Sequence, residues 1–201
     1  MSAAFSLVGG GRLPCGYPDG VPALPVTVRV ADLPDVPGLV ALGVRTFVDT
    51  YAAANDPADV EAQVAATYSE ELVGAALRDP SVTYLVVDDD GGRLAGFAKV
   101  VVPSHEEGIE ADRPAEISQL YVDSGQKGRG IGRALVDAGA AHARGLGCDY
   151  LWLGVWERNP PAIAFYERIG LRQVGTHHFQ FGSDLQTDLL MGMSLMVSDS
   201  R

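Results

Sequence analysis

This sequence has few cysteines, few basic residues and no long apolar run. Its two cysteines, Cys15 and Cys148, are too few for a disulfide framework and lack zinc spacing, and its four histidines form no metal-binding motif. Acidic residues outnumber basic ones by 26 to 15, which gives a formal net charge of −11. That balance argues against nucleic acid as a partner, because phosphate backbones need a positive footprint. No stretch approaches the ~18 apolar residues of a membrane span. We therefore expect no metal, no nucleic acid, no membrane and a reducing cytoplasm.

The chain has 201 residues, enough for a single domain with its own core. Residues 1–24 mix glycine and proline without periodicity and lack the apolar core of a secretory signal, so we predict a flexible leader there. The domain is expected over residues 25–197, and residues 198–201 form a short tail.

Alternating apolar residues and helix caps predict the elements of this domain. Helices are expected after Asp32, after Asn55 and Asp56, after Ser69, over 131–144, and from Asn159 to Gly170. Strands are expected at 25–31, 82–87, 94–102, 116–122, 150–155, 171–175 and 189–196, with a polar loop at 181–188. The pattern predicts an α/β fold of the α+β kind: a mixed, mostly antiparallel sheet with helices on both faces.

Residues 116–133, EISQLYVDSGQKGRGIGR, join an apolar strand to a helix through a polar turn. Gly128, Gly130 and Gly132 remove side chains that would hold an anion away from the backbone, and the first N–H groups of the helix are unpaired. Basic residues in the same turn add positive charge: Lys127, Arg129 and Arg133. The stretch therefore predicts a phosphate or pyrophosphate site.

Neither of two common nucleotide-binding loops fits this stretch. A Rossmann loop needs a third glycine where Arg133 stands, and Asp149 precedes a predicted strand rather than ending one. A P-loop needs G-K-[ST], which is absent. A glycine-rich surface turn is the plainer alternative, although each glycine in a helix interior costs ~1 kcal/mol relative to alanine.

The run Lys127-Gly128-Arg129-Gly130-Ile131-Gly132 resembles the [QR]-x-x-G-x-[GA] signature of the GNAT superfamily of N-acetyltransferases, with lysine in the first position. QLYV before the turn and NPPAIAFYERIGLRQVG after it extend the resemblance over roughly residues 25–197. It implies a twisted sheet of about seven strands and acetyl-CoA as cosubstrate. It also implies an arm of acetyl-CoA between two splayed strands and a pyrophosphate at the turn. The implied contacts are Leu120, Tyr121, Val122, Lys127, Gly128, Arg129, Gly130, Ile131, Gly132, Arg133, Asn159 and Tyr166.

Acetylation of an amine requires two proton transfers. The acceptor is an ammonium at neutral pH, and Glu116 is suited to take its proton because it precedes Leu120 by four residues and so shares a strand face with it. The loop acids Glu106, Glu107 and Glu110 are alternatives. In the resemblance, the N–H of Leu120 serves as oxyanion donor.

The leaving thiolate gains from a proton donor, and Tyr166 is the candidate acid. The family pattern N-x-x-A-x-x-[FY]-Y falls on Asn159, Ala162, Phe165 and Tyr166, which implies a cofactor contact for Asn159 and the acid role for Tyr166. A capping asparagine and a core tyrosine are the alternative interpretation. Cys148 lacks a neighbouring base, so direct transfer is preferred over a covalent acetyl-cysteine.

The acceptor is the least determined part. TFVDTYAAANDPADVEAQV and FQFGSDLQTDLLM make the chain most similar to bacterial spermidine/spermine (diamine)-type acetyltransferases, and a small polyamine agrees with the net charge of −11. Protein N-termini, lysines, aminoglycosides and amino acids stay open as acceptors. A non-catalytic acetyl-CoA-binding sensor also stays open, as does a homodimer.

Overall fold

The computed structural model describes residues 26–182 and 184–196, so the predicted leader, which includes Cys15, and the predicted tail lie outside the described residues. The strands are β1 (Arg29–Val30), β2 (Val82–Asp88), β3 (Leu94–Val101), β4 (Pro114–Val122), β5 (Tyr150–Trp156), β6 (Arg172–Phe181) and β7 (Asp184–Ser194). They form one sheet in the order β1-β2-β3-β4-β5-β7-β6. Neighbours are antiparallel except for β4 and β5, which confirms the predicted mixed, mostly antiparallel sheet.

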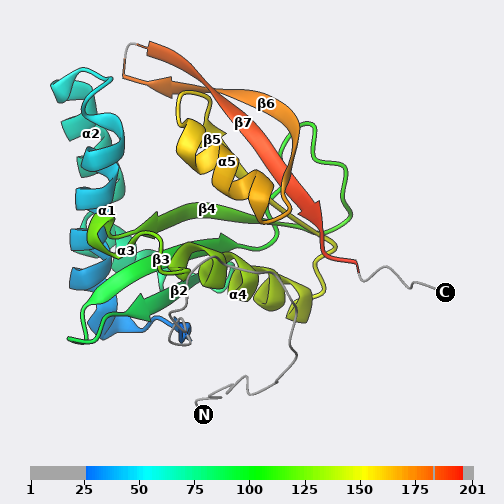
Figure 1. The fold of residues 1–201 in the computed structure, drawn as a ribbon, viewed down its shortest axis with the longest axis horizontal. Coiled ribbons are helices and arrows are strands. Elements are labelled where there is room, and N and C mark those ends of the chain that lie inside the picture. The colour runs from blue at the N-terminus through cyan, green and yellow to red at the C-terminus, as the bar shows by residue number, and fades with distance from the viewer. Residues whose placement is uncertain (1–25, 183, 197–201) are drawn as a thin grey trace.

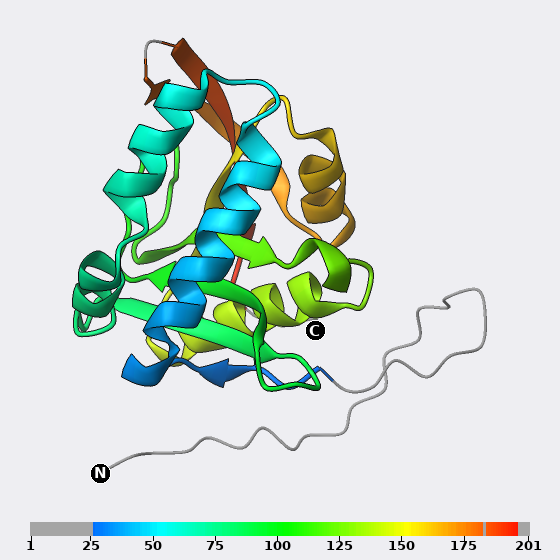
Figure 2. The same cartoon turned by 90° about the vertical axis from the view of Figure 1, so that its left-hand side faces the viewer.

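Helices cover both faces of the sheet, as predicted (Figures 1 and 2). They are α1 (Val36–Tyr51), α2 (Pro57–Thr67), α3 (Glu70–Ala76), α4 (Ile131–Gly145) and α5 (Pro160–Arg168). On one face, α1 and α3 pack on β2 and β3 through a buried cluster that includes Leu39, Leu42 and Phe97. On the other, α4 and α5 pack on β2 to β5 through the largest buried cluster. Figure 2 shows α1 crossing in front of the sheet.

The helix starts follow the predicted caps. The side chain of Asp56 accepts a hydrogen bond from the N–H of Ala58, and that of Ser69 accepts one from Leu72. Pro57 stands at the first position of α2, where its missing N–H costs nothing. These local signals fix where α2 and α3 begin.

The last two strands are longer than predicted. β6 and β7 pair without a break from Arg172 opposite Gly192 to Phe181 opposite Asp184, apart from one irregularity. The loop predicted at 181–188 is therefore wrong, because most of it belongs to β7. β6 is an edge strand whose side chains are largely exposed, so it lacks the apolar alternation by which a half-buried strand is recognised.

Candidate functional site

A groove opens where the two parallel strands separate. β4 and β5 pair only from Pro114 opposite Tyr150 to Glu116 opposite Trp152, although both strands continue for several residues. Beyond that point the strands border a groove of about 650 Å³, which is also lined by the end of α1, the turn before α4, and α5. The sequence could not show this separation, because both strands have ordinary apolar patterns.

The backbone of β4 presents N–H groups to this groove. Asp123 donates its N–H to the carbonyl of Ala95 on β3, at 2.9 Å. In an antiparallel pair, every second residue bonds the neighbouring strand. The next residue of β4 that bonds β3 is therefore Tyr121, which lies opposite Phe97. The N–H groups of Leu120 and Val122 consequently point the other way, into the groove. Leu120, Tyr121 and Val122 all line it, and their contact with acetyl-CoA stays a prediction.

A β-bulge at Ser118 changes which face of β4 carries Glu116. Gln119 pairs with Lys99 and Ile117 with Val100, so Ser118 is an extra residue without a partner. Ile117 and Leu120 both pack toward α4, whereas Glu116 lies on the opposite face, beside Ser104. The expectation that Glu116 and Leu120 share a face is therefore wrong, because counting by two fails across a bulge.

The turn before α4 has the conformation that its glycines allow. Gly128 and Gly130 have φ of 80° and 83°, a region that other L-residues rarely adopt. The first intrahelical bond runs from Ala134 to the carbonyl of Gly130, so the N–H groups of Ile131, Gly132 and Arg133 have no intrahelical partner. A Cβ at Gly132 would lie 3.2 Å from the Phe165 ring. The turn thus combines free amides with close approach to α5.

The basic side chains of this turn are exposed, but two of them have protein partners. Arg133 pairs with Asp137 one turn along α4, at 2.8 Å, and Arg129 bonds Gln126. Of the three predicted basic contacts, Lys127 and Arg133 line the groove and Arg129 does not. The exposed charge at this end of the groove still suits an anion.

Asn159 and Tyr166 both line the groove from α5. Asn159 caps α5, accepting a hydrogen bond from Ala162 at 3.3 Å, so it has the capping role of the alternative interpretation as well as a place in the groove wall. Tyr166 is 8% exposed, and burial raises the pKa of its hydroxyl. No described residue bonds that hydroxyl. A phenol that keeps its proton and faces a ligand groove suits a proton donor.

Acidic residues gather on the face of the sheet that carries Glu116. The Glu116 carboxylate accepts a hydrogen bond from Ser104 at 2.7 Å, and burial raises its pKa despite the nearby Lys99. Of the predicted loop acids, the structure brings Glu106 to this face, where it lies 3.5 Å from His177. Glu107 and Glu110 are exposed. His177 and Asp188 are absent from the predicted site residues, because both lie in a stretch where no strand was predicted.

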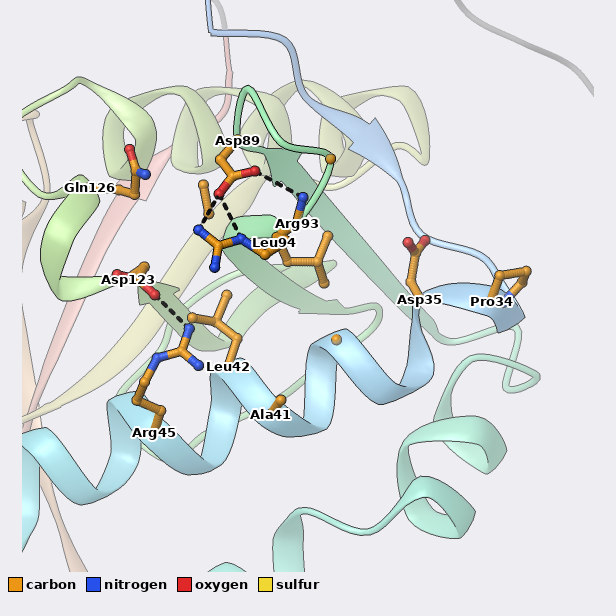
Figure 3. Close-up of a pocket in the computed structure, with 13 residues that line it drawn as sticks. Pro34, Asp35, Ala41, Leu42, Arg45, Asp89, Arg93, Leu94, Asp123 and Gln126 are labelled. Atoms are coloured by element: carbon orange, nitrogen blue, oxygen red, sulfur yellow. Dashed lines mark hydrogen bonds and ion pairs between the residues drawn. The ribbon is translucent and has the colours of Figure 1, made fainter.

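A second cavity, of about 580 Å³, lies between α1, the β2–β3 turn and the turn that follows β4 (Figure 3). Its charged side chains are paired: Arg45 with Asp123, and Arg93 with Asp89. Asp123 also accepts a bond from the N–H of Gly125. The first pair therefore ties α1 to the turn that leads into the glycines, and we assign this cavity no ligand.

Neither a metal site nor a membrane helix is found in the part of the chain that the structure describes. None of its acidic, histidine and cysteine side chains form a group suited to a metal ion, and no helix there is long and apolar enough to cross a membrane.

Comparison with known families decides between the interpretations of the glycine turn. A model described as the acetyltransferase (GNAT) family matches residues 46–171. The chain belongs to this family. The match includes β4, the glycine turn, β5 and Tyr166, so the expected GNAT membership is confirmed.

Relatives support the family without fixing the acceptor. An uncharacterized N-acetyltransferase in the pepI 3′ region of Lactobacillus delbrueckii subsp. lactis is 31% identical over 162 residues, which cover 81% of this chain and 93% of the relative. A mycothiol acetyltransferase from Beutenbergia cavernae is 39% identical over 99 residues, which cover 49% of this chain and 31% of that relative. The PaiA N-acetyltransferase of Thermoplasma acidophilum, solved with coenzyme A, is similar in fold, with a TM-score of 0.68 at 20% identity over 85% of this chain and 99% of that one.

Proposed function

We propose that this GNAT protein transfers the acetyl group of acetyl-CoA directly to a primary amine, and that the acceptor is a small polyamine. The observation that carries the proposal is the groove between β4 and β5. It runs from the glycine turn, which suits phosphates, past the N–H groups of Leu120 and Val122 to Tyr166. On its β5 side it borders the acidic face of the sheet.

Each step of the proposed reaction is assigned to a group in or beside the groove. Acetyl-CoA supplies the acetyl group as a thioester. The N–H of Leu120 would stabilise the negative charge that develops on the carbonyl oxygen. Tyr166 would protonate the leaving thiolate, and Glu116 would take a proton from the acceptor ammonium, directly or through a water molecule. Asn159, Lys127 and the turn up to Arg133 would hold the cosubstrate.

Direct transfer is supported by the state of Cys148. Its side chain is buried in the core beneath α4, and burial raises the pKa of its thiol, which disfavours the thiolate that a covalent mechanism needs. A free, buried thiol also agrees with a reducing cytoplasm as the compartment that we propose.

The polyamine acceptor is supported by charge. Glu116, Glu106 and Asp188 face the same side of the sheet, and the chain carries a net charge of −11. An exposed ammonium–carboxylate contact contributes no more than ~1 kcal/mol, so selectivity requires several such contacts at once. A molecule with several ammonium groups meets that requirement.

The decisive experiment compares acceptors by thiol release from acetyl-CoA. We expect spermidine to have a higher kcat/KM than propylamine or a lysine-bearing peptide, and the preference to fall as salt rises, because a Debye length of about 8 Å at physiological ionic strength screens exposed charges. Changing Glu106, Glu107 and Glu110 together to glutamine should lower the spermidine rate. The matched control changes Glu61, Glu70 and Glu71 on α2 and α3, which are exposed acids away from the groove.

Three outcomes would each contradict one part of the proposal. A peptide as best substrate favours a protein N-terminus or lysine as acceptor. Acetyl-CoA binding without thiol release favours the sensor. A spermidine rate that responds neither to salt nor to the loop change refutes the electrostatic argument. Light scattering tests the proposed homodimer against a monomer of 21.2 kDa.

A further inference from the structure

Asp188 is a carboxylate beside the groove to which the roles above assign no chemistry. It lies on β7, opposite Trp156 of β5 and opposite His177 of β6. β7 runs between these two strands (Figure 1). A carboxylate oxygen of Asp188 lies 3.4 Å from the position that a Cβ would take at Gly154. Gly154 and Trp156 both line the groove, so Asp188 lies directly behind the β5 wall of the groove, on the neighbouring strand.

The carboxylate of Asp188 is mostly buried yet receives no hydrogen bond from the described residues. Its side chain is 23% exposed, and its recorded polar neighbour, Nε2 of His177, is 3.9 Å away, beyond hydrogen-bond distance. Burial raises its pKa, and nearby Glu157 acts in the same direction. A carboxylate offers about four acceptor positions, and those of Asp188 that no described residue fills stay open to water or to a ligand.

His177 cannot meet this need alone, because it stands between two carboxylates. Its Nδ1 lies 3.5 Å from Glu106, and its Nε2 faces Asp188. A neutral imidazole has one N–H, so at least one of the two carboxylates lacks a donor from this ring. Neither distance is that of a formed hydrogen bond.

The neighbouring strand β5 carries a buried donor without a partner. The indole N–H of Trp156 is buried and has no partner among the described residues, and Trp156 as a whole is 5% exposed. Trp156 and Asp188 are direct neighbours across β5 and β7. The groove wall and the strand behind it therefore hold a buried N–H without a partner and a partly exposed carboxylate that no described donor fills. Only the carboxylate can accept a hydrogen bond from an ammonium.

We propose that Asp188 binds the reacting ammonium of the acceptor at the β5 side of the groove, and that Glu106, beyond His177, binds a second ammonium of the same molecule. This inference rests on the proposed function and names what selects its substrate: a compound with two or more ammonium groups. Asp188 is then the specificity-determining residue for any amine, while Glu106 distinguishes diamines from monoamines.

The test measures amine KM at saturating acetyl-CoA for spermidine and for propylamine. Asp188→Asn should raise KM for both amines at least tenfold, and Asp188→Glu, which keeps the charge, should restore part of the loss. Glu106→Gln should raise KM for spermidine and leave that for propylamine unchanged. Glu70→Gln, an exposed charge change on α3 away from the groove, is the matched control and should alter neither value.

A binding measurement separates this inference from the proposed function. Calorimetry of spermidine added to the protein–CoA complex should show binding to the wild type and at least tenfold weaker binding to Asp188→Asn. If spermidine binding depends on Asp188 but no thiol is released with any amine, the function fails and the inference stands. If thiol is released and Asp188→Asn leaves both KM and spermidine affinity unchanged, Asp188 does not select the acceptor and the inference is refuted.

Discussion

Replacing Gly130 by alanine isolates the contribution of backbone conformation to anion binding. Gly130 precedes α4 with φ of 83° and ψ of −2°, and a Cβ built there would meet nothing within 4 Å. The substitution therefore adds no clash. Its cost is conformational, about 1–2 kcal/mol for an L-residue in the left-handed region.

That free-energy cost must lower either the stability of the folded protein or its affinity for acetyl-CoA. If the turn keeps its shape, the free energy of unfolding falls by about 1–2 kcal/mol; if the turn rearranges, the amides of residues 131–133 are displaced and acetyl-CoA affinity falls instead. A loss of 1.4 kcal/mol corresponds to about tenfold in Kd. We expect most of the loss in binding, because residues 127–130 are all exposed and little packing opposes their rearrangement.

Calorimetry with acetyl-CoA and urea unfolding measure the two losses on the same variants. Gly130→Asn should lose less than Gly130→Ala, since asparagine adopts the left-handed conformation more readily. Gly145→Ala is the matched control: Gly145 ends α4, has open space around its Cα, and should leave affinity unchanged. Unchanged affinity and stability in Gly130→Ala would refute the argument from backbone conformation.

Two further predictions concern the proposed acid and base. Tyr166→Phe should keep acetyl-CoA affinity and lower kcat, because the buried, protonated hydroxyl acts on the leaving thiolate rather than in ground-state binding; an equal kcat would remove Tyr166 from the mechanism. Glu116→Gln should increase stability at neutral pH. Burial raises the folded pKa of Glu116 above its ordinary value of 4.5. The protonated carboxyl therefore contributes to the stability of the folded protein below that pH, and this contribution is lost as the pH rises through the raised pKa. The stability difference between variant and wild type, followed by urea unfolding, should grow over that window and then level off; a constant difference would contradict the assignment.

Local signals predicted much of this fold, because caps and apolar alternation act within a few residues. Asp56, Ser69 and Asn159 cap the helices assigned to them. The β2–β3 hairpin appears as predicted, because both strands are largely buried and each consists of a nearly continuous run of apolar residues. The glycine turn was recognisable because left-handed residues at a helix start require glycine.

The remaining features depend on partners far away in the sequence. The bulge at Ser118 exists only relative to the pairing with β3, so no property of EISQLYV indicated that Glu116 and Leu120 would face opposite ways. Asp188 was assigned to a loop because its neighbours on β6 are exposed and polar. The spacing of Gln186, Asp188 and Leu190 by two residues could have indicated a strand, since all three lie on one face of β7.

Because β4 and β5 pair through only three residue pairs, the rest of β4 has an unpaired edge although the strand lies inside the sheet. Outer edges with free N–H and C=O groups are open to pairing with other chains, and proteins must protect them. Here the free edge of β4 lies between strands and beneath helices α4 and α5, where a second protein chain cannot pair with it but an extended ligand with amide groups can join it like a short additional strand. Since the groups that would receive that ligand belong to the backbone, side chains on either face can change the acceptor without altering how the cosubstrate is held.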